Sequence, residues 1–457
     1  MAKQKQKPIK ARAMHALEQI NLNAAGIDIG AEEVYVAVPP DRDGQSVRRF
    51  ATFTADFNQL AEWLKACRIT TVAMEATGVY WIALFEILEE RGFEVYLVNA
   101  RHVKNVSGRK TDVLDCQWIQ QLHTYGLLRP SFRPPEQIVA IRSLVRHREG
   151  LVQYRSAHVQ QMQKALTVMN LRLSNVLSDI TGVSGMNILR AIVAGERNPH
   201  TLAQFRDERC AHSKTEIAKA LEGHYKPEQV FLLKQSLELY DFYERQIQAC
   251  DQQLQALYDQ FDPPDAPGTP PPPPHTAKRR KHQAHFDLDA ALYRMTGVDL
   301  TRIAGVDAMT IQKVLSETGT DMSRWPTEKH FAAWLRLCPN NQITGGKLKH
   351  TGVEPTQNRA STALRVAAAS LSRSDSALGA FYRRIRARSG GPVAVTATAH
   401  KLARIIYAML KNRTAYQDAG AQSYELLFRE RMVRHLNRQA ARFGFRLEPA
   451  SQHGHVS

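Results

Sequence analysis

The chain has 457 residues, of which 43% are hydrophobic, so it can bury a sizeable interior but is too long for one ordinary core. Its formal net charge of +17 favours a polyanionic partner. Five scattered cysteines without a CxxC pair exclude a zinc signature and a disulfide framework, and no apolar run looks long enough to span a membrane.

Residues 1–22 are basic, and no apolar segment follows them, which predicts an arm lying on phosphates rather than a signal peptide. Residues 23–130 then predict an α/β domain with a mixed sheet. Alternating and β-rich runs indicate two strands joined by a tight turn within 25–38, and one strand each within 46–53, 69–76 and 93–100. Helices are expected over 56–67, 79–91 and the stretch "GRKTDVLDCQWIQQL" (108–122).

That last stretch places Asp112 and Asp115 three residues apart, so they share one face of a helix and repel each other. One interpretation is a helix start, where the dipole favours acidic residues. The other is a divalent cation held between the two carboxylates. Asp28 and Glu75 each end a predicted strand, where turn or cap roles are equally ordinary.

Together the four acids can meet at one edge of a mixed sheet, where uncompensated anions would be costly. Two divalent cations, about 3.5–4 Å apart, would neutralise them and hold a scissile phosphate. Four nearby cations would then hold the flanking nucleic-acid backbone: Arg101, Lys104, Arg109 and Lys110.

Residues 131–261 read as long helices with a break at 194–205, forming either a hairpin packed on itself or a coiled coil with a partner. Glu244 and Asp251 interrupt the apolar spacing of the second long helix. Residues 262–284 are a proline-rich basic linker, expected to be stiff and extended.

Residues 285–418 predict a second compact domain, followed by a helical and disordered tail over 419–457. Residues 300–319 have the pattern of a helix-hairpin-helix around "AGVD". Between 345 and 413 there are 13 lysines and arginines against two acids, which indicates a DNA or RNA contact. The cations assigned to that contact are Lys347, Lys349, Arg359 and Arg365.

The motifs "GIDIG", "MEATGVYW" and "RKTDVLDCQWI" resemble three blocks of the ribonuclease H-like (RuvC-like) DEDD domain of IS110-family insertion-sequence transposases. The motifs "FAAWLRLCPNNQITGGKLKH" and "NRASTALRVAAASL" are similar to the family's all-α C-terminal transposase domain. The resemblance covers roughly residues 23–130 and 290–415, with the family's coiled-coil region between them.

The resemblance implies that Asp28, Glu75, Asp112 and Asp115 bind Mg²⁺ or Mn²⁺, as two ions. The family's nucleophile is a serine that forms a covalent bond to DNA, and its position matches Thr344 here. Threonine keeps the hydroxyl but restricts χ1, and an inert turn threonine is the alternative interpretation.

The resemblance further implies a noncoding bridge RNA that pairs with donor and target DNA, dimers joined into a tetramer, and a bacterial, nucleoid-associated location in the cytoplasm. The predicted function is metal-dependent DNA cleavage and strand exchange through a covalent hydroxyl–DNA intermediate. The alternatives are a hydrolytic DEDD endonuclease resembling a junction resolvase, and a DNA-binding copy with impaired chemistry.

Overall fold

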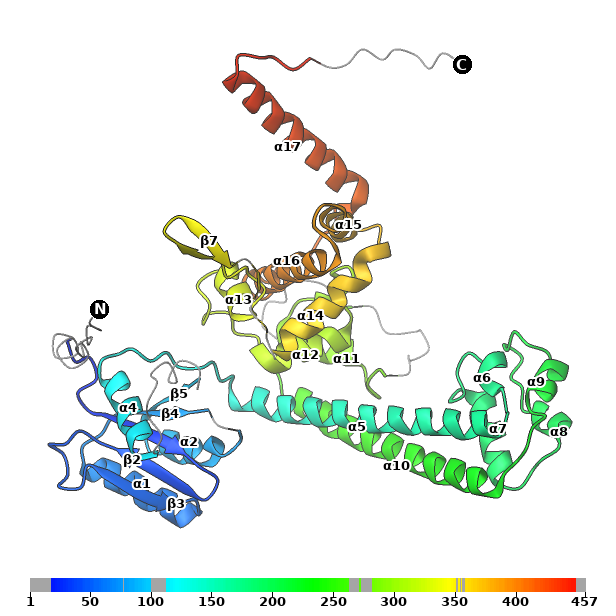
Figure 1. Cartoon of the computed structure of the whole chain (residues 1–457), viewed down its shortest axis with the longest axis horizontal. Coiled ribbons are helices and arrows are strands. Elements are labelled where there is room, and N and C mark those ends of the chain that lie inside the picture. Colours follow the sequence, from blue (N-terminus) through cyan, green and yellow to red (C-terminus); the bar gives the residue numbers. More distant parts are fainter. Residues whose placement is uncertain are drawn as a thin grey trace, which may run out of the picture. The chain divides into compact units, whose positions relative to one another are not determined.

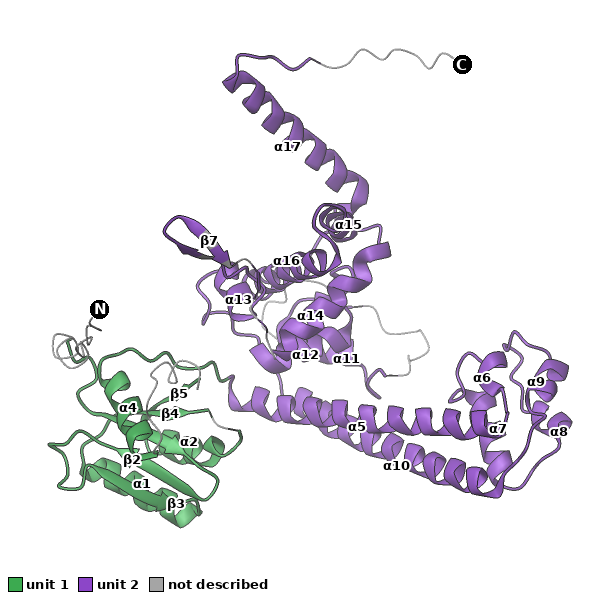
Figure 2. Ribbon diagram, viewed as in Figure 1, with its two compact units in different colours: residues 1–133 green, residues 134–457 purple. Residues whose placement is uncertain are grey.

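The computed structural model divides the chain into two compact units, residues 1–133 and residues 134–457 (Figure 2). The residues that it describes are 18–76, 78–99, 112–262, 271–272, 282–350, 352–353, 355 and 358–448. The basic arm, most of the proline-rich linker and the end of the tail therefore lie outside the described residues.

The first unit is built on a five-stranded mixed sheet with the strand order β3-β2-β1-β4-β5. β1 pairs antiparallel with β2 and parallel with β4, and β4 pairs parallel with β5. The mixed sheet predicted from the alternating runs is thereby confirmed. The strands are β1 (Ala24–Ile29), β2 (Glu33–Ala37), β3 (Val47–Ala51), β4 (Thr71–Glu75) and β5 (Glu94–Val98).

Helices cover both faces of this sheet. On one face, α1 (Thr54–Ala66) and α2 (Trp81–Glu90) bury a core that includes Ile27 and Met74. On the other face, α4 (Asp112–Thr124) packs through Ile119 against Ala73 and Val98. Because successive strand residues point to opposite faces, Asp28 and Glu75 share the face that α4 covers.

The second unit begins with a long helical hairpin, in which α5 (Glu136–Val168) packs along α10 (Pro227–Tyr258) (Figure 1). Asp251 forms a buried ion pair with Arg148 on α5, at 2.5 Å, and Glu244 pairs with Arg155 on the same helix. The two acids that interrupt the apolar spacing therefore join the two helices of one chain. A coiled coil with a partner stays a prediction.

Short helices connect the far ends of α5 and α10 and enclose a core of their own. This core packs Leu189 and Ile192 against Ile217 and Leu237, all of them buried. The connecting helices are α6 (Leu173–Val176), α7 (Val183–Val193), α8 (Pro199–Ala203) and α9 (Lys214–Ala220).

The remaining helices, except the last, form a bundle whose helix α12 packs on α5. Glu317 on α12 accepts hydrogen bonds from Arg146 on α5, at 2.8–3.0 Å. The bundle helices are α11 (Leu288–Thr296), α12 (Ala308–Thr318), α13 (Glu328–Trp334), α14 (Arg359–Ser370), α15 (Ala377–Ser389) and α16 (Gly391–Asn412), with 3-10 turns η2 (Leu300–Arg302) and η3 (Leu371–Arg373). The last helix, α17 (Gly420–Arg442), follows the bundle.

Within residues 300–319, the three-residue turn η2 precedes the "AGVD" turn, and α12 follows it after an N-cap at Asp307. A helix-hairpin-helix at this place stays a prediction.

Among the described residues, α16 alone has the length and composition of a membrane-spanning helix. Half of its apolar window is buried, and it contacts α13, α14 and α15. The buried residues Leu402 and Ile406 have the position expected of a core helix, which accounts for its hydrophobicity.

Candidate metal centre and nucleophile

Asp28 stands near the end of β1, between two buried isoleucines that point to the opposite face of the sheet. Its neighbour across the antiparallel pair is Tyr35 on β2. Strand alternation therefore forces the carboxylate toward α4. It is half-buried, so the folded chain places a negative charge at the edge of its interior.

The close approach of α4 to β1 depends on Gly26, two residues before Asp28. A Cβ atom added at Gly26 would lie 2.2 Å from the backbone nitrogen of Gln120 and 2.3 Å from the carbonyl oxygen of Cys116, both on α4. No other amino acid fits there unless the helix moves. This contact brings the first turn of α4 to the strand that carries Asp28.

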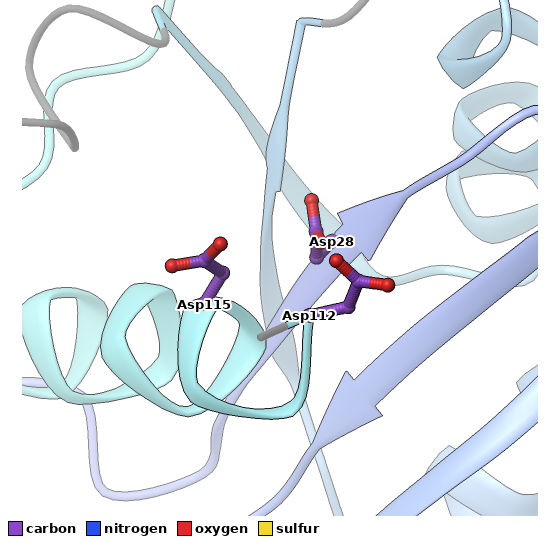
Figure 3. A group of neighbouring side chains, drawn as sticks. All are labelled: Asp28, Asp112 and Asp115. Atoms are coloured by element: carbon purple, nitrogen blue, oxygen red, sulfur yellow. The ribbon is translucent and has the colours of Figure 1, made fainter. Parts of the chain in front are cut away.

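Asp28, Asp112 and Asp115 form a group in which one carboxylate oxygen from each lies within 4.8 Å of the other two (Figure 3). Asp112 is exposed and Asp115 is half-buried, and both belong to the first turn of α4. The helix dipole favours acids in that turn, but it does not explain why the strand contributes a third one.

The electrostatics of this group are unfavourable without a counter-charge. Burial, and then the negative charges of Asp112, Asp115 and Glu75, raise the pKa of Asp28 to about 6. Glu75 is the last residue of β4, the strand that pairs with β1. Its influence on Asp28 means that all four acids named from the sequence lie in one electrostatic neighbourhood.

The donor set fits a hard divalent cation, because carboxylate oxygens are the ligands that Mg²⁺ and Mn²⁺ prefer. A divalent cation would also compensate the burial and the neighbouring negative charges that raise the pKa of Asp28. Cys116, also on α4, is not part of this group. Burial raises the pKa of its thiol to about 12, and that thiol donates to the Val113 carbonyl oxygen at 3.2 Å. Divalent-metal use is thus consistent with the acids present.

Thr344 belongs to the second unit, in an antiparallel hairpin formed by β6 (Gln342–Thr344) and β7 (Lys347–His350). The turn consists of Gly345 and Gly346, whose φ angles of 57° and 75° suit glycine. Thr344 is exposed, and no described residue donates to or accepts from its hydroxyl. The hydroxyl is therefore accessible to solvent.

The cations named from the sequence fall into three groups. Arg101, Lys104, Arg109 and Lys110 lie outside the described residues. Lys347 and Lys349 are exposed on β7, next to Thr344. Arg359 pairs with Glu149 at 2.5 Å, and Arg365 donates to the Arg336 carbonyl oxygen at 3.5 Å, so both also have roles within the unit.

Sequence reasoning missed two residues of this region. Gly26 sets the distance between α4 and β1, and a glycine inside a strand is a known signal of close backbone approach. His123, fully buried at the end of α4, bonds the Thr71 hydroxyl at 2.8 Å and packs on Tyr96. Burial lowers the pKa of His123 to about 4, so this end of α4 is held by a neutral imidazole.

Two family models match the chain. One, described as a transposase and named for the DEDD transposases of the IS110 type, matches residues 25–170. The other, described as "Transposase IS116/IS110/IS902 family", matches residues 299–383. The chain is also 25% identical to a "Probable family 20 transposase" of Pseudomonas aeruginosa over 414 residues, which cover 87% of this chain and 99% of that protein. From these matches, the chain belongs to the IS110 family of transposases.

Proposed function

We propose that this transposase cleaves and exchanges DNA strands with Asp28, Glu75, Asp112 and Asp115 as its metal ligands and Thr344 as its nucleophile. The observation that carries the proposal is the group of carboxylates from β1 and α4 within 4.8 Å, together with the raised pKa of Asp28. The first unit then acts as a RuvC-like domain of the ribonuclease H class.

The four acids hold two divalent cations, Mg²⁺ or Mn²⁺, whose chemistry is to withdraw charge from the scissile phosphate. Thr344 contributes its Oγ, which attacks phosphorus while the bond to one sugar oxygen breaks. The hydroxyl proton leaves to solvent, and the displaced sugar oxygen takes up a proton. The new phosphodiester retains the energy of the old one, so a second strand can displace Thr344 without ATP.

The basic C-terminal residues, including Lys347 and Lys349, hold DNA phosphates beside the cleavage point. A bridge RNA supplies base pairing to donor and target DNA, so that the protein reads mainly backbone and duplex shape. The chain has three working parts: the RuvC-like domain 23–130, the coiled-coil region 131–261 and the transposase domain 285–418. The arm 1–22 precedes them, the linker 262–284 separates the second from the third, and the tail 419–457 follows. Dimers associate into a tetramer on the DNA, in the bacterial cytoplasm at the nucleoid.

The proposal is tested with a suicide DNA substrate that traps the covalent intermediate. The parent protein is expected to give a protein–DNA adduct that survives denaturation, and peptide mapping is expected to place the DNA on Thr344. Thr344→Ser should keep the adduct, because a primary hydroxyl is less hindered. Thr344→Val keeps the shape but removes the hydroxyl, so it should lose the adduct and the strand exchange.

A second candidate is hydrolysis by a DEDD endonuclease that uses water and leaves Thr344 passive. The Thr344 hydroxyl favours this candidate, because it is exposed and makes no hydrogen bond to a described residue that would activate it. Cleavage by Thr344→Val at the parent's rate, with no adduct in the parent, would establish hydrolysis. Binding without cleavage by the parent, in Mg²⁺ and in Mn²⁺, would instead identify a copy with impaired chemistry.

A further inference from the structure

The last helix, α17, lies beyond the residues that the second family model matches, which end at 383. It projects from the end of the bundle (Figure 1), and none of its residues is buried. An isolated helix draws most of its stability from packing, so an exposed helix of 23 residues calls for a partner.

The base of α17 is anchored on α15 and α16 through aromatic rings and cations. The Arg384 guanidinium lies 3.8 Å from the ring centre of Phe428 and 5.0 Å from that of Tyr424. Lys401 on α16 lies 5.2 Å from the same Tyr424 ring. Such contacts hold the start of the helix while leaving both cations charged.

Several positive charges lie close together where α17 contacts α15 and α16. Burial, and then the charges of Arg384, Arg431 and Arg404, lower the pKa of Lys401. α15 and α16 together carry seven cations and no acid, and the acid that faces Arg404 is Glu328, at 2.9 Å. The remaining cations repel one another, and a bound anion would relieve that repulsion.

One face of α17 continues this positive surface. Spacings of three and four residues place a single stripe along the helix, beginning with the two anchored aromatic residues. We call it the α17 stripe; its members are Tyr424, Phe428, Arg431, His435, Arg438 and Arg442. From Arg431 to Arg442 the helix advances about 16 Å, so the guanidinium groups are spread over a length that several backbone phosphates occupy.

We propose that the α17 stripe, with Arg384 and Lys401 at its base, binds the sugar–phosphate backbone of a nucleic-acid duplex. Arginine suits phosphate through its planar fork of donors. The surface contributes affinity and position rather than sequence reading. It includes none of the acidic residues of the first unit, so the proposal does not depend on whether those residues bind metal.

A second copy of the chain is the rival occupant, since Leu426, Val433 and Leu436 are exposed on α17 away from the stripe. The charges argue against that pairing. α17 has five arginines against two glutamates, so two such helices side by side would repel each other. Glu430, one of the two acids, is paired with Arg434 at 3.2 Å.

The test compares Arg438→Gln, on the stripe, with Arg429→Gln, an equally exposed arginine of the same helix on its other side. Full-length protein is titrated with a 30-base-pair DNA duplex, and with an RNA duplex of the same sequence, in EDTA at several salt concentrations. Arg438→Gln should reduce the slope of log affinity against log salt by about 0.9 for DNA. Arg429→Gln should leave the slope unchanged, and circular dichroism checks that both variants fold.

A reduced slope for Arg438→Gln with either duplex supports binding of the backbone by the α17 stripe. The duplex whose slope changes shows whether the stripe binds DNA or RNA. Equal slopes for Arg438→Gln, Arg429→Gln and the parent would overturn the proposal. So would a result in which Leu436→Gln changes the oligomeric mass and the affinity together, while Arg438→Gln changes neither. EDTA excludes metal-dependent cleavage, so failure here is distinguishable from failure of the proposed reaction.

Discussion

The acidic group of β1 and α4 and the β6–β7 hairpin that carries Thr344 differ in how firmly the chain holds them. Asp28, Asp112 and Asp115 stand on a paired strand and a helix whose backbones touch through Gly26. Thr344 ends a three-residue strand in a two-stranded hairpin, beside two glycines with positive φ. Two strands alone are only marginally stable, so we infer that the acids are preorganised and that the hydroxyl is positioned when nucleic acid binds.

The largest effect is expected from Gly26→Ala, which disturbs the packing that positions the acidic group. Its Cβ would overlap the α4 backbone, so α4 must move and take Asp112 and Asp115 away from Asp28. We expect a loss of roughly 1–3 kcal/mol in the free energy of unfolding. Mn²⁺ affinity should fall as well, as measured by the loss of the free-ion electron paramagnetic resonance signal.

Gly44→Ala is the matched control, because a Cβ there meets nothing within 4 Å. It should leave both stability and Mn²⁺ affinity close to the parent values. If Gly26→Ala bound Mn²⁺ as tightly as Gly44→Ala, the contact between α4 and β1 would not set the geometry of the acids.

A smaller effect concerns pH in the absence of metal. The pKa of Asp28 rises from 3.8 to about 6 on folding, so between these values the folded chain binds more protons than the unfolded chain. The stabilisation is present at low pH and is lost as pH rises through 6. Asp28→Asn should therefore be more stable than the parent at pH 7.5 by roughly 1–2 kcal/mol, a figure reduced because Asp28 is partly exposed and solvent screens its charge.

Denaturant melts of parent and Asp28→Asn at pH 4.5 and 7.5, both in EDTA, measure this difference. His123 also makes stability depend on pH, but with the opposite sign: its lowered pKa costs stability as pH falls from 6.5 toward 4. Both proteins contain His123, so its contribution cancels in the comparison. A gap between the two proteins that narrows as pH rises would contradict the raised pKa of Asp28.

The smallest effect is expected from substitutions in the β6–β7 hairpin that carries Thr344. Gly345→Ala places a Cβ at a φ of 57°, at a cost of about 1 kcal/mol within the hairpin. Gly345→Asn should be tolerated better, because asparagine accepts this conformation. Both variants should bind Mn²⁺ like the parent, while Gly345→Ala yields less covalent adduct. Reduced Mn²⁺ binding in Gly345→Ala would mean that the two regions are coupled without DNA.

Local patterns were sufficient to predict much of the sheet. Alternation in residues 25–38 and a shared strand end for Asp28 and Glu75 indicated a mixed sheet with acids at one edge, and the strands confirm this arrangement. The role of Gly26 was not predictable, because it depends on which helix returns to that strand. The pairing of Arg359 with Glu149 on α5 was equally hidden, because 210 residues separate the two.

The long helical hairpin of α5 and α10 shows the same limit of prediction from sequence. Glu244 and Asp251 looked like interruptions of an apolar spacing, yet they pair with Arg155 and Arg148 on a helix about 90–100 residues earlier. Periodicity reports which residues share a face, but it does not report what that face meets. The exposed charge of α17 is a similar case, since only the folded bundle shows that its aromatic residues are anchored on Arg384.

Titration of Mn²⁺ into the full-length protein, followed by the free-ion signal, measures whether the acids of β1 and α4 bind a divalent metal. Asp112→Asn and Asp115→Asn should each weaken binding by about 100-fold or more. Asp56→Asn, an acid in the first turn of α1, and Thr344→Val should bind like the parent. If Asp115→Asn bound Mn²⁺ with the parent's affinity and stoichiometry, the acids of β1 and α4 would be an ordinary helix start and no metal centre.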